Sequence, residues 1–134
     1  MRKNIGYRHH FACLRIFGDQ LDFDQITKQF KLKPDHTHKK GERRTPTSPR
    51  YLSDSWQTKA KLPTSRPHIH HIEWLYKHLK RNTSYLKKLS KTCSIDIYCS
   101  YHSNYDQGNL EFSPGLLQLC GQTKISIKIS ILVQ

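Results

Sequence analysis

The stretch that decides the fold is FACLRIFGDQLDFDQITKQF, residues 11–30. Apolar side chains alternate along residues 11–17, which is typical of a β-strand with two distinct faces. Gly18 and Asp19 break this strand, and a short helix is expected over residues 23–30, with Asp22 or Asp24 as its N-cap. One face of the expected strand holds Ala12, Leu14 and Ile16, and the other holds Phe11, Cys13, Arg15 and Phe17.

A similar order of elements recurs near the C-terminus. Residues 94–101 alternate as a strand, and Ser113-Pro114 then marks the start of a short helix that Gly121 is expected to end. The final strand, residues 124–132, alternates isoleucine with polar residues, the pattern of a half-buried antiparallel strand. The related tetrapeptides LDFD and LEFS precede the two short helices, at residues 21–24 and 110–113. The sequence therefore predicts two strand–helix–strand halves.

The longest expected helix lies between the two halves. Pro67 opens it, and a second short helix carrying Leu86 and Leu89 follows. The apolar stripe of the long helix comprises Ile69, Ile72, Leu75, Tyr76 and Leu79, at helical spacing. Before it, a short strand is expected near Thr37–Lys39, and a longer one over residues 50–60 has Leu52 and Trp56 as apolar anchors.

These elements predict one compact α+β domain over residues 1–134. Its sheet has four to five strands, antiparallel or mixed, and the helices lie mainly on one face. We expect a ferredoxin-like arrangement, with the two halves around the long central helix. Residues 1–8 are expected to form a flexible basic N-terminus, and residues 35–50 a basic loop rich in turn formers.

Composition points to an anionic partner. Of the 134 residues, 35% are hydrophobic, which predicts a single domain with a thin core. Lys and Arg number 23 against ten acidic residues, for a formal net charge of +13, and fourteen of those 23 lie within residues 36–93. Such a charge favours nucleic acid, an acidic protein face or an anionic membrane surface as partner.

Cysteine usage and hydropathy favour the cytoplasm. The four cysteines, Cys13, Cys93, Cys99 and Cys120, include no pair with CxxC spacing, so buried free thiols in a reducing compartment are expected. The N-terminus has no apolar run of signal-peptide length. No stretch approaches the roughly 18 apolar residues of a membrane helix, so we expect no membrane insertion.

The order of several short motifs resembles a known family. These motifs are Cys13–Asp19, Leu21, Ile26-Thr27, Leu32–Pro34, Lys39–Glu42, Trp56 and the amphipathic helix after it. They resemble a small bacterial family, the domain of unknown function with serial number four-two-seven-nine, over nearly the whole chain. The resemblance implies a compact single-domain α+β protein of a bacterium or phage. It brings no established activity, so no catalytic residue is carried over.

Ten basic residues are the candidate contacts for a polyanion or partner. They are Lys39, Lys40, Arg43 and Arg44 in the basic loop, and Lys77, Lys80, Arg81, Lys87, Lys88 and Lys91 on the helices. The loop lacks the spacing of a nucleotide-binding phosphate loop, and we interpret it as a flexible basic tongue or a solvated loop. Contacts of this kind act by counterion release and carry little sequence preference.

Aromatic residues near these basic ones have two interpretations. Trp56, Trp74, Tyr76 and Tyr85 could stack on unpaired bases, or they could belong to the core. We expect Trp56 and Trp74 to be buried. The sequence has no helix-turn-helix or RNA-recognition-motif signature, so sequence-specific readout is not predicted.

Histidines and carboxylates give only weak signals of chemistry. His36, His38, His68 and His70 are weak candidates for a metal, but no zinc-finger or HExxH spacing accompanies them. A polar surface explains them equally well, so we predict no metal and no cofactor. Asp19, Asp22 and Asp24 serve as helix caps and first-turn acids as readily as they serve acid–base catalysis.

We therefore expect a small non-enzymatic binding protein with a basic face for an anionic macromolecule. Nucleic acid, bound without strong sequence specificity, is the first hypothesis. The alternative is an immunity- or inhibitor-type module whose basic face docks on an acidic partner protein. An enzyme of unknown class is a distant third, and the sequence does not indicate an oligomeric state.

Overall fold

β1 (Arg8–Gly18) is the central strand of a five-stranded sheet with the order β2-β3-β1-β4-β5. The structure, a computed structural model, describes residues 8–104 and 109–133, so the N-terminus expected to be flexible lies, apart from Arg8, outside the described residues. The other strands are β2 (His36–His38), β3 (Asp54–Lys59), β4 (Ser94–Ser103) and β5 (Ile125–Val133).

The sheet is mixed. β1 pairs antiparallel with both β3 and β4, and β2 pairs antiparallel with β3. β5 instead runs parallel to β4, so the prediction of an antiparallel final strand is wrong. The reason is that a helix joins β4 to β5 and returns the chain to its starting end, as parallel neighbours require.

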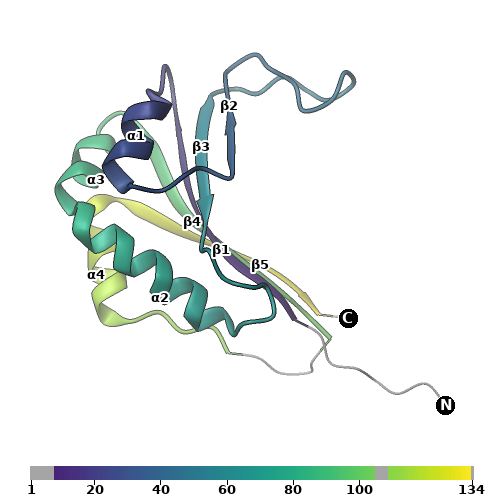
Figure 1. Ribbon diagram of the computed structural model, residues 1–134, viewed down its shortest axis with the longest axis vertical. Coiled ribbons are helices and arrows are strands. Elements are labelled where there is room, and N and C mark those ends of the chain that lie inside the picture. Colours follow the sequence, from purple (N-terminus) through teal and green to yellow (C-terminus); the bar gives the residue numbers. More distant parts are fainter. Residues whose placement is uncertain (1–7, 105–108, 134) are drawn as a thin grey trace.

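Within the described residues the helices lie on one side of this sheet, as Figure 1 shows, in agreement with the prediction that they lie mainly on one face. They are α1 (Phe23–Phe30), α2 (His68–Leu79), the 3₁₀ turn η1 (Lys80–Asn82), α3 (Thr83–Leu89) and α4 (Pro114–Thr123). The halves β1-α1-β2 and β4-α4-β5 flank α2 and α3, while β3 lies between β1 and β2. This order is compatible with the expected ferredoxin-like arrangement. Among the described residues, no helix is long and apolar enough to cross a membrane.

Local chemistry explains where the two short helices begin and end. The Asp22 side chain caps α1 by accepting from the Gln25 N–H, and Ser113 caps α4 by accepting from the Leu116 N–H. α4 continues past Gly121, which was expected to stop it. It ends instead at Thr123, because the next residue, Lys124, adopts a left-handed conformation with φ of 58° and its backbone N–H donates to the Cys120 carbonyl.

The core lies between the sheet and the helix layer. Ala12, Leu14 and Ile16 face the helices and are at most 1% exposed, as the alternation of β1 predicts. From the helices, Ile72, Leu75 and Leu79 meet them, while Ile69 and Tyr76 are half-buried. Burying each large apolar side chain contributes about 1.5–3 kcal/mol, so this layer supplies most of the stability.

The anchors expected for the third strand differ from each other. Trp56 is fully buried, and its indole N–H donates to the Thr27 hydroxyl oxygen at 3.1 Å. Leu52, by contrast, is 89% exposed, and the strand begins only at Asp54. Residues 50–53 instead belong to a hairpin and to the bend after it, which carry the chain away from the core.

Candidate functional site

Residues 39–51, here called the basic hairpin, form a hydrogen-bonded structure rather than an irregular loop. The Gly41 N–H donates to the Tyr51 carbonyl and the Tyr51 N–H donates to the Glu42 carbonyl, both at 2.9 Å. Arg43 and Arg50 form a further β-bridge, and a turn from Thr45 closes the tip. In Figure 1 the basic hairpin extends from the sheet on the side away from the helices.

A buried carboxylate holds the base of the basic hairpin. Asp54 accepts from the backbone N–H of Lys40 at 2.8 Å and from that of Leu21 at 2.9 Å. The hydrogen bond from Lys40 lowers the pKa of Asp54, and that from Leu21 acts in the same direction. Gly41, with φ of +88°, provides the turn that follows. Asp54 thus fixes the basic hairpin to the turn after β1.

Several residues that carry the family resemblance meet around this carboxylate. They line an open depression of about 530 Å³, formed by Asp19, Gln20, Leu21, Lys39, Lys40 and Asp54. Both Asp54 carboxylate oxygens accept hydrogen bonds from backbone N–H groups. We therefore interpret this carboxylate as a structural hydrogen-bond acceptor rather than as a general acid or base.

The basic side chains of the hairpin are exposed. Four of them, Lys39, Lys40, Arg43 and Arg44, were predicted from the sequence, and Arg50 joins them. Arg50 donates to the Gly41 carbonyl at 2.8 Å, and Arg43 donates to the Pro46 carbonyl at 3.0 Å. The Lys39 Nζ lies over the Phe23 ring, 4.6 Å from its centre. The only acidic side chain in residues 39–51 is Glu42.

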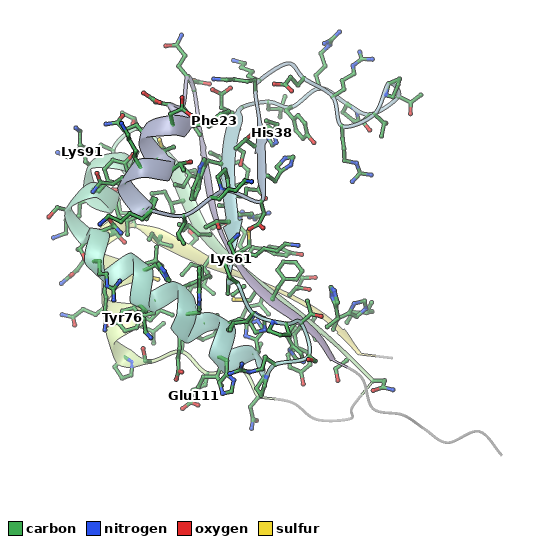
Figure 2. The ribbon with its side chains drawn as sticks, in the orientation of Figure 1. Phe23, His38, Lys61, Tyr76, Lys91 and Glu111 are labelled. Carbon is green, nitrogen blue, oxygen red and sulfur yellow. The ribbon has the colours of Figure 1, made fainter. Side chains whose placement is uncertain are left out.

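The other six predicted basic residues form a separate group. Lys77, Lys80, Arg81, Lys87, Lys88 and Lys91 are all exposed on or beside α2, η1 and α3. Figure 2 shows Lys91 on the helix side, whereas His38 lies near the base of the basic hairpin. The structure therefore brings the ten residues together as two groups on opposite sides of the sheet, and not as one face.

The sheet surface opposite the helices, here called the open face, carries a network of cations and rings. Arg15 donates two hydrogen bonds of 2.8 Å to Asp96, and Lys128 lies 3.4 Å from the same carboxylate. The Arg15 guanidinium lies 4.5 Å from the centre of the Tyr98 ring and 5.3 Å from that of Phe17. The hydrogen bond to Asp96 raises the pKa of Arg15, which keeps the guanidinium charged.

The weak metal candidates lie in two places. The His36 and His38 rings approach to 2.8 Å between nitrogens, and His38 stacks on Tyr51 with ring centres 3.5 Å apart. His70 accepts from Arg66 at 3.1 Å. Among the described residues, no group of three His, Cys, Asp or Glu side chains is arranged to hold a metal ion.

His68 is buried, which differs from the polar surface that the sequence suggested. It packs beside His10 and His71 under the start of α2, where all three are at most 3% exposed. Burial lowers the pKa of His68 to about 4, and the neighbouring His10 and His71 add to this shift. The ring is therefore neutral at pH 7 and belongs to the core.

The four cysteines are free thiols; Cys13, Cys99 and Cys120 are buried as predicted, whereas Cys93 is half-buried. Burial raises the pKa of Cys13 and of Cys99 to about 12, and that of Cys120 to about 11. A thiol with such a pKa stays protonated at pH 7 and is a poor nucleophile. Cys99 and Cys120 therefore act as small core residues, and Cys13 is a buried side chain on the other face of the sheet.

The aromatic residues considered for stacking pack mainly against the core. Trp56 is fully buried, and Tyr85 meets Phe30 edge-on at 5.6 Å. Trp74 and Tyr76 are half-buried on α2, so Trp74 is less covered than expected. Phe11 and Tyr98, which are also half-buried, lie on the open face. The alternation of residues 11–17 did assign Phe11 to that face.

Comparison with known proteins identifies a family whose description gives no function. A family model described as "Domain of unknown function (DUF4279)" matches residues 7–134, which agrees with the resemblance seen in the sequence. No curated protein and no solved structure matches the chain.

Proposed function

The chain belongs to the DUF4279 family, whose description assigns no activity, and we propose that it is a small non-enzymatic protein that binds nucleic acid without strong sequence preference. The observation that supports this best is the basic hairpin. It presents five exposed basic side chains and one acidic side chain on a hydrogen-bonded backbone. Phosphate groups are the natural partners of such an array, because Lys and Arg displace the counterions condensed around them.

The basic hairpin is a better candidate than the helical group for two reasons. Its cations come from thirteen consecutive residues, and Asp54 fixes the hairpin to the sheet, so little ordering is needed on binding. It also extends on the same side as the open face, whose cations Arg15, Lys59 and Lys128 continue the positive surface. The helical group lies across the sheet, so we assign it to a secondary role.

We place the protein in the cytoplasm as part of the same proposal. Free, protonated core thiols suit a reducing compartment, where disulfides rarely persist. Nucleic acid is abundant there.

Two matched triple variants test the proposal. One removes Lys40, Arg43 and Arg44 from the basic hairpin, and the other removes Lys87, Lys88 and Lys91 from the helical group, each by substitution with Ala. Affinity for a labelled oligonucleotide of about 20 nucleotides is measured by fluorescence anisotropy between about 50 and about 200 mM salt. Both variants lose the same charge, so any difference between them reports position.

We expect the hairpin variant to bind at least about tenfold more weakly than the unmodified protein. Its slope of log binding constant against log salt concentration should be smaller in magnitude by roughly two. The helical variant should lose less than about threefold. Equal losses in both variants would contradict the assignment to the hairpin. An unmodified protein that does not bind at the lowest salt would contradict nucleic-acid binding itself.

An acidic protein is the second candidate partner, in the manner of an immunity or inhibitor module. The observation that favours it is apolar exposure along the edge strand β5, where Ile129, Ile131 and Leu132 are 44–60% exposed. Exposed apolar residues of this kind occur at the centres of protein interfaces. This candidate predicts that the unmodified protein and both triple variants bind oligonucleotides weakly. It also predicts no difference in affinity between single and double strands.

A further inference from the structure

The open face is built from alternate residues of all five strands. Strand register places them in rows that cross the sheet. One row is His36, Gln57, Arg15, Asp96 and Ser126; the next is Lys59, Cys13, Tyr98 and Lys128; a third is Phe11, Ser100 and Ser130. Figure 1 shows that the helices of the described chain all lie on the other side.

Aromatic rings occupy the middle of this face. The Phe11 and Tyr98 ring centres are 6.0 Å apart, with the ring planes tilted by 35°, and both side chains are partly exposed. Because each comes from a neighbouring central strand, their positions are fixed by the sheet and not by a loop.

A cation lies over each of the two rings. Lys59 lies 4.3 Å from the centre of the Phe11 ring, and Arg15 lies 4.5 Å from that of Tyr98. The one acidic side chain in the rows given above, Asp96, is already paired with Arg15 and Lys128. The remaining charge is positive and complements a phosphate backbone that passes over the rings.

We propose that the open face is a stacking platform for the unpaired bases of a single-stranded nucleic acid, with the basic hairpin holding the adjoining phosphates. This inference rests on the proposed function and names its substrate class. Every base has a flat face that stacks on an aromatic ring, so such a platform binds single strands with little sequence preference. In a duplex the base faces are covered by their neighbours, and only the phosphates remain available.

The same chemistry argues against a second copy of this chain on the open face. Apart from Phe11, Tyr98 and the buried Cys13, the rows given above hold only polar or charged side chains, so the apolar part of the face is small for the centre of a stable dimer interface. Two copies face to face would also oppose Lys59 and Lys128 with cations of the same kind. Dimerisation is therefore an outcome that would count against the proposal.

The test removes the rings and keeps an apolar side chain at each position. The double variant Phe11→Leu with Tyr98→Leu is compared with Trp74→Leu, a half-buried aromatic residue on the helix side. The probes are labelled oligothymidylate of about 20 nucleotides and a mixed-sequence duplex of the same length. Thermal melting by circular dichroism confirms that each variant folds, and size-exclusion chromatography with light scattering gives its mass.

We expect the ring variant to bind the single strand at least about tenfold more weakly and the duplex less than about twofold more weakly, with Trp74→Leu unchanged on both. Unchanged single-strand binding by a folded ring variant, alongside weakened binding by the hairpin variant, would overturn this inference and leave the proposed function standing. Absence of binding to either probe would overturn both. A dimer that dissociates in the ring variant would assign the face to self-association instead.

A second measurement does not depend on any substitution. An oligonucleotide carrying photoreactive 4-thiouridine is cross-linked to the unmodified protein, and the modified peptides are identified by mass spectrometry. Cross-links to β1 and β4 at Phe11 or Tyr98 are the expected result. Cross-links confined to α2 and α3 would overturn the proposal.

Discussion

Ala12, Leu14 and Ile16 point from β1 into the helix layer and are at most 1% exposed, whereas Phe11, Arg15 and Phe17 point the other way and stay partly exposed. One strand thus serves two environments with alternate residues. On the covered face, the polar groups include the His68 imidazole, whose pKa burial lowers to about 4. On the open face, charges are retained, because each lies beside an opposite charge or an aromatic ring. The comparison separates the residues that hold the fold from those that are available to a partner.

The largest expected effect comes from breaking the covered face. Leu14→Ala removes a fully buried side chain from the central strand, and we expect it to lower the free energy of unfolding by about 3 kcal/mol. Phe17→Leu on the open face should lower it by less than about 1.5 kcal/mol. Urea denaturation followed by circular dichroism measures both. Similar losses at the two positions would show that the open face is also covered.

The second-largest expected effect is the pH dependence of stability that the buried His68 produces. Burial holds the pKa of His68 at about 4 in the folded protein, against the ordinary value of 6.5. The unfolded chain therefore binds the extra proton first, and stability is lost as pH falls from 6.5 toward 4. Between about pH 7.5 and about pH 5 we expect a loss of about 2 kcal/mol from this group. Burial lowers the pKa of His71 as well, which adds to the loss.

Urea denaturation at these two pH values checks this prediction in matched variants. His68→Gln should reduce the difference in unfolding free energy between the two pH values, whereas Leu14→Ala should leave that difference unchanged. Asp54 and Asp35, whose pKa values are lowered by hydrogen bonds, titrate below this window and do not interfere. An unchanged difference in His68→Gln would show that His68 is not held neutral.

The smallest expected effect breaks the open face. Arg15→Leu leaves the Asp96 carboxylate, 3% exposed, with Lys128 at 3.4 Å in place of the bidentate guanidinium. We expect a loss of about 1.5 kcal/mol in unfolding free energy, because a buried charge then lacks its best hydrogen-bond donors. Adding Asp96→Leu should recover at least about half of this loss, because no unpaired carboxylate remains. A double variant less stable than Arg15→Leu alone would contradict this view of the pair.

Local pattern predicted much of the fold. The alternation of residues 11–17 correctly divided β1 into its two faces, and Asp22 caps α1 as expected. Leu52 was wrongly predicted as an apolar anchor, because a lone apolar residue beside a turn does not indicate whether other elements pack against it. The direction of β5 was missed because alternation reports burial on one face and not the direction of the neighbouring strand.

The candidate site was predicted less well, because it depends on contacts between distant residues. Asp54 was missed because its partners are backbone N–H groups of Leu21 and Lys40, which any sequence can supply. His68 was misread because its burial depends on β1, almost 60 residues earlier. The ten basic residues were identified as exposed, but their separation into two groups follows only from the sheet order.

The measurement that tests the account most directly compares single- and double-stranded oligonucleotides of about 20 nucleotides bound to the unmodified protein, by fluorescence anisotropy from about 50 to about 200 mM salt. We predict micromolar or tighter binding at the lowest salt, a steep loss of affinity as salt rises, and tighter binding of the single strand. Absence of binding to both at the lowest salt would contradict the account.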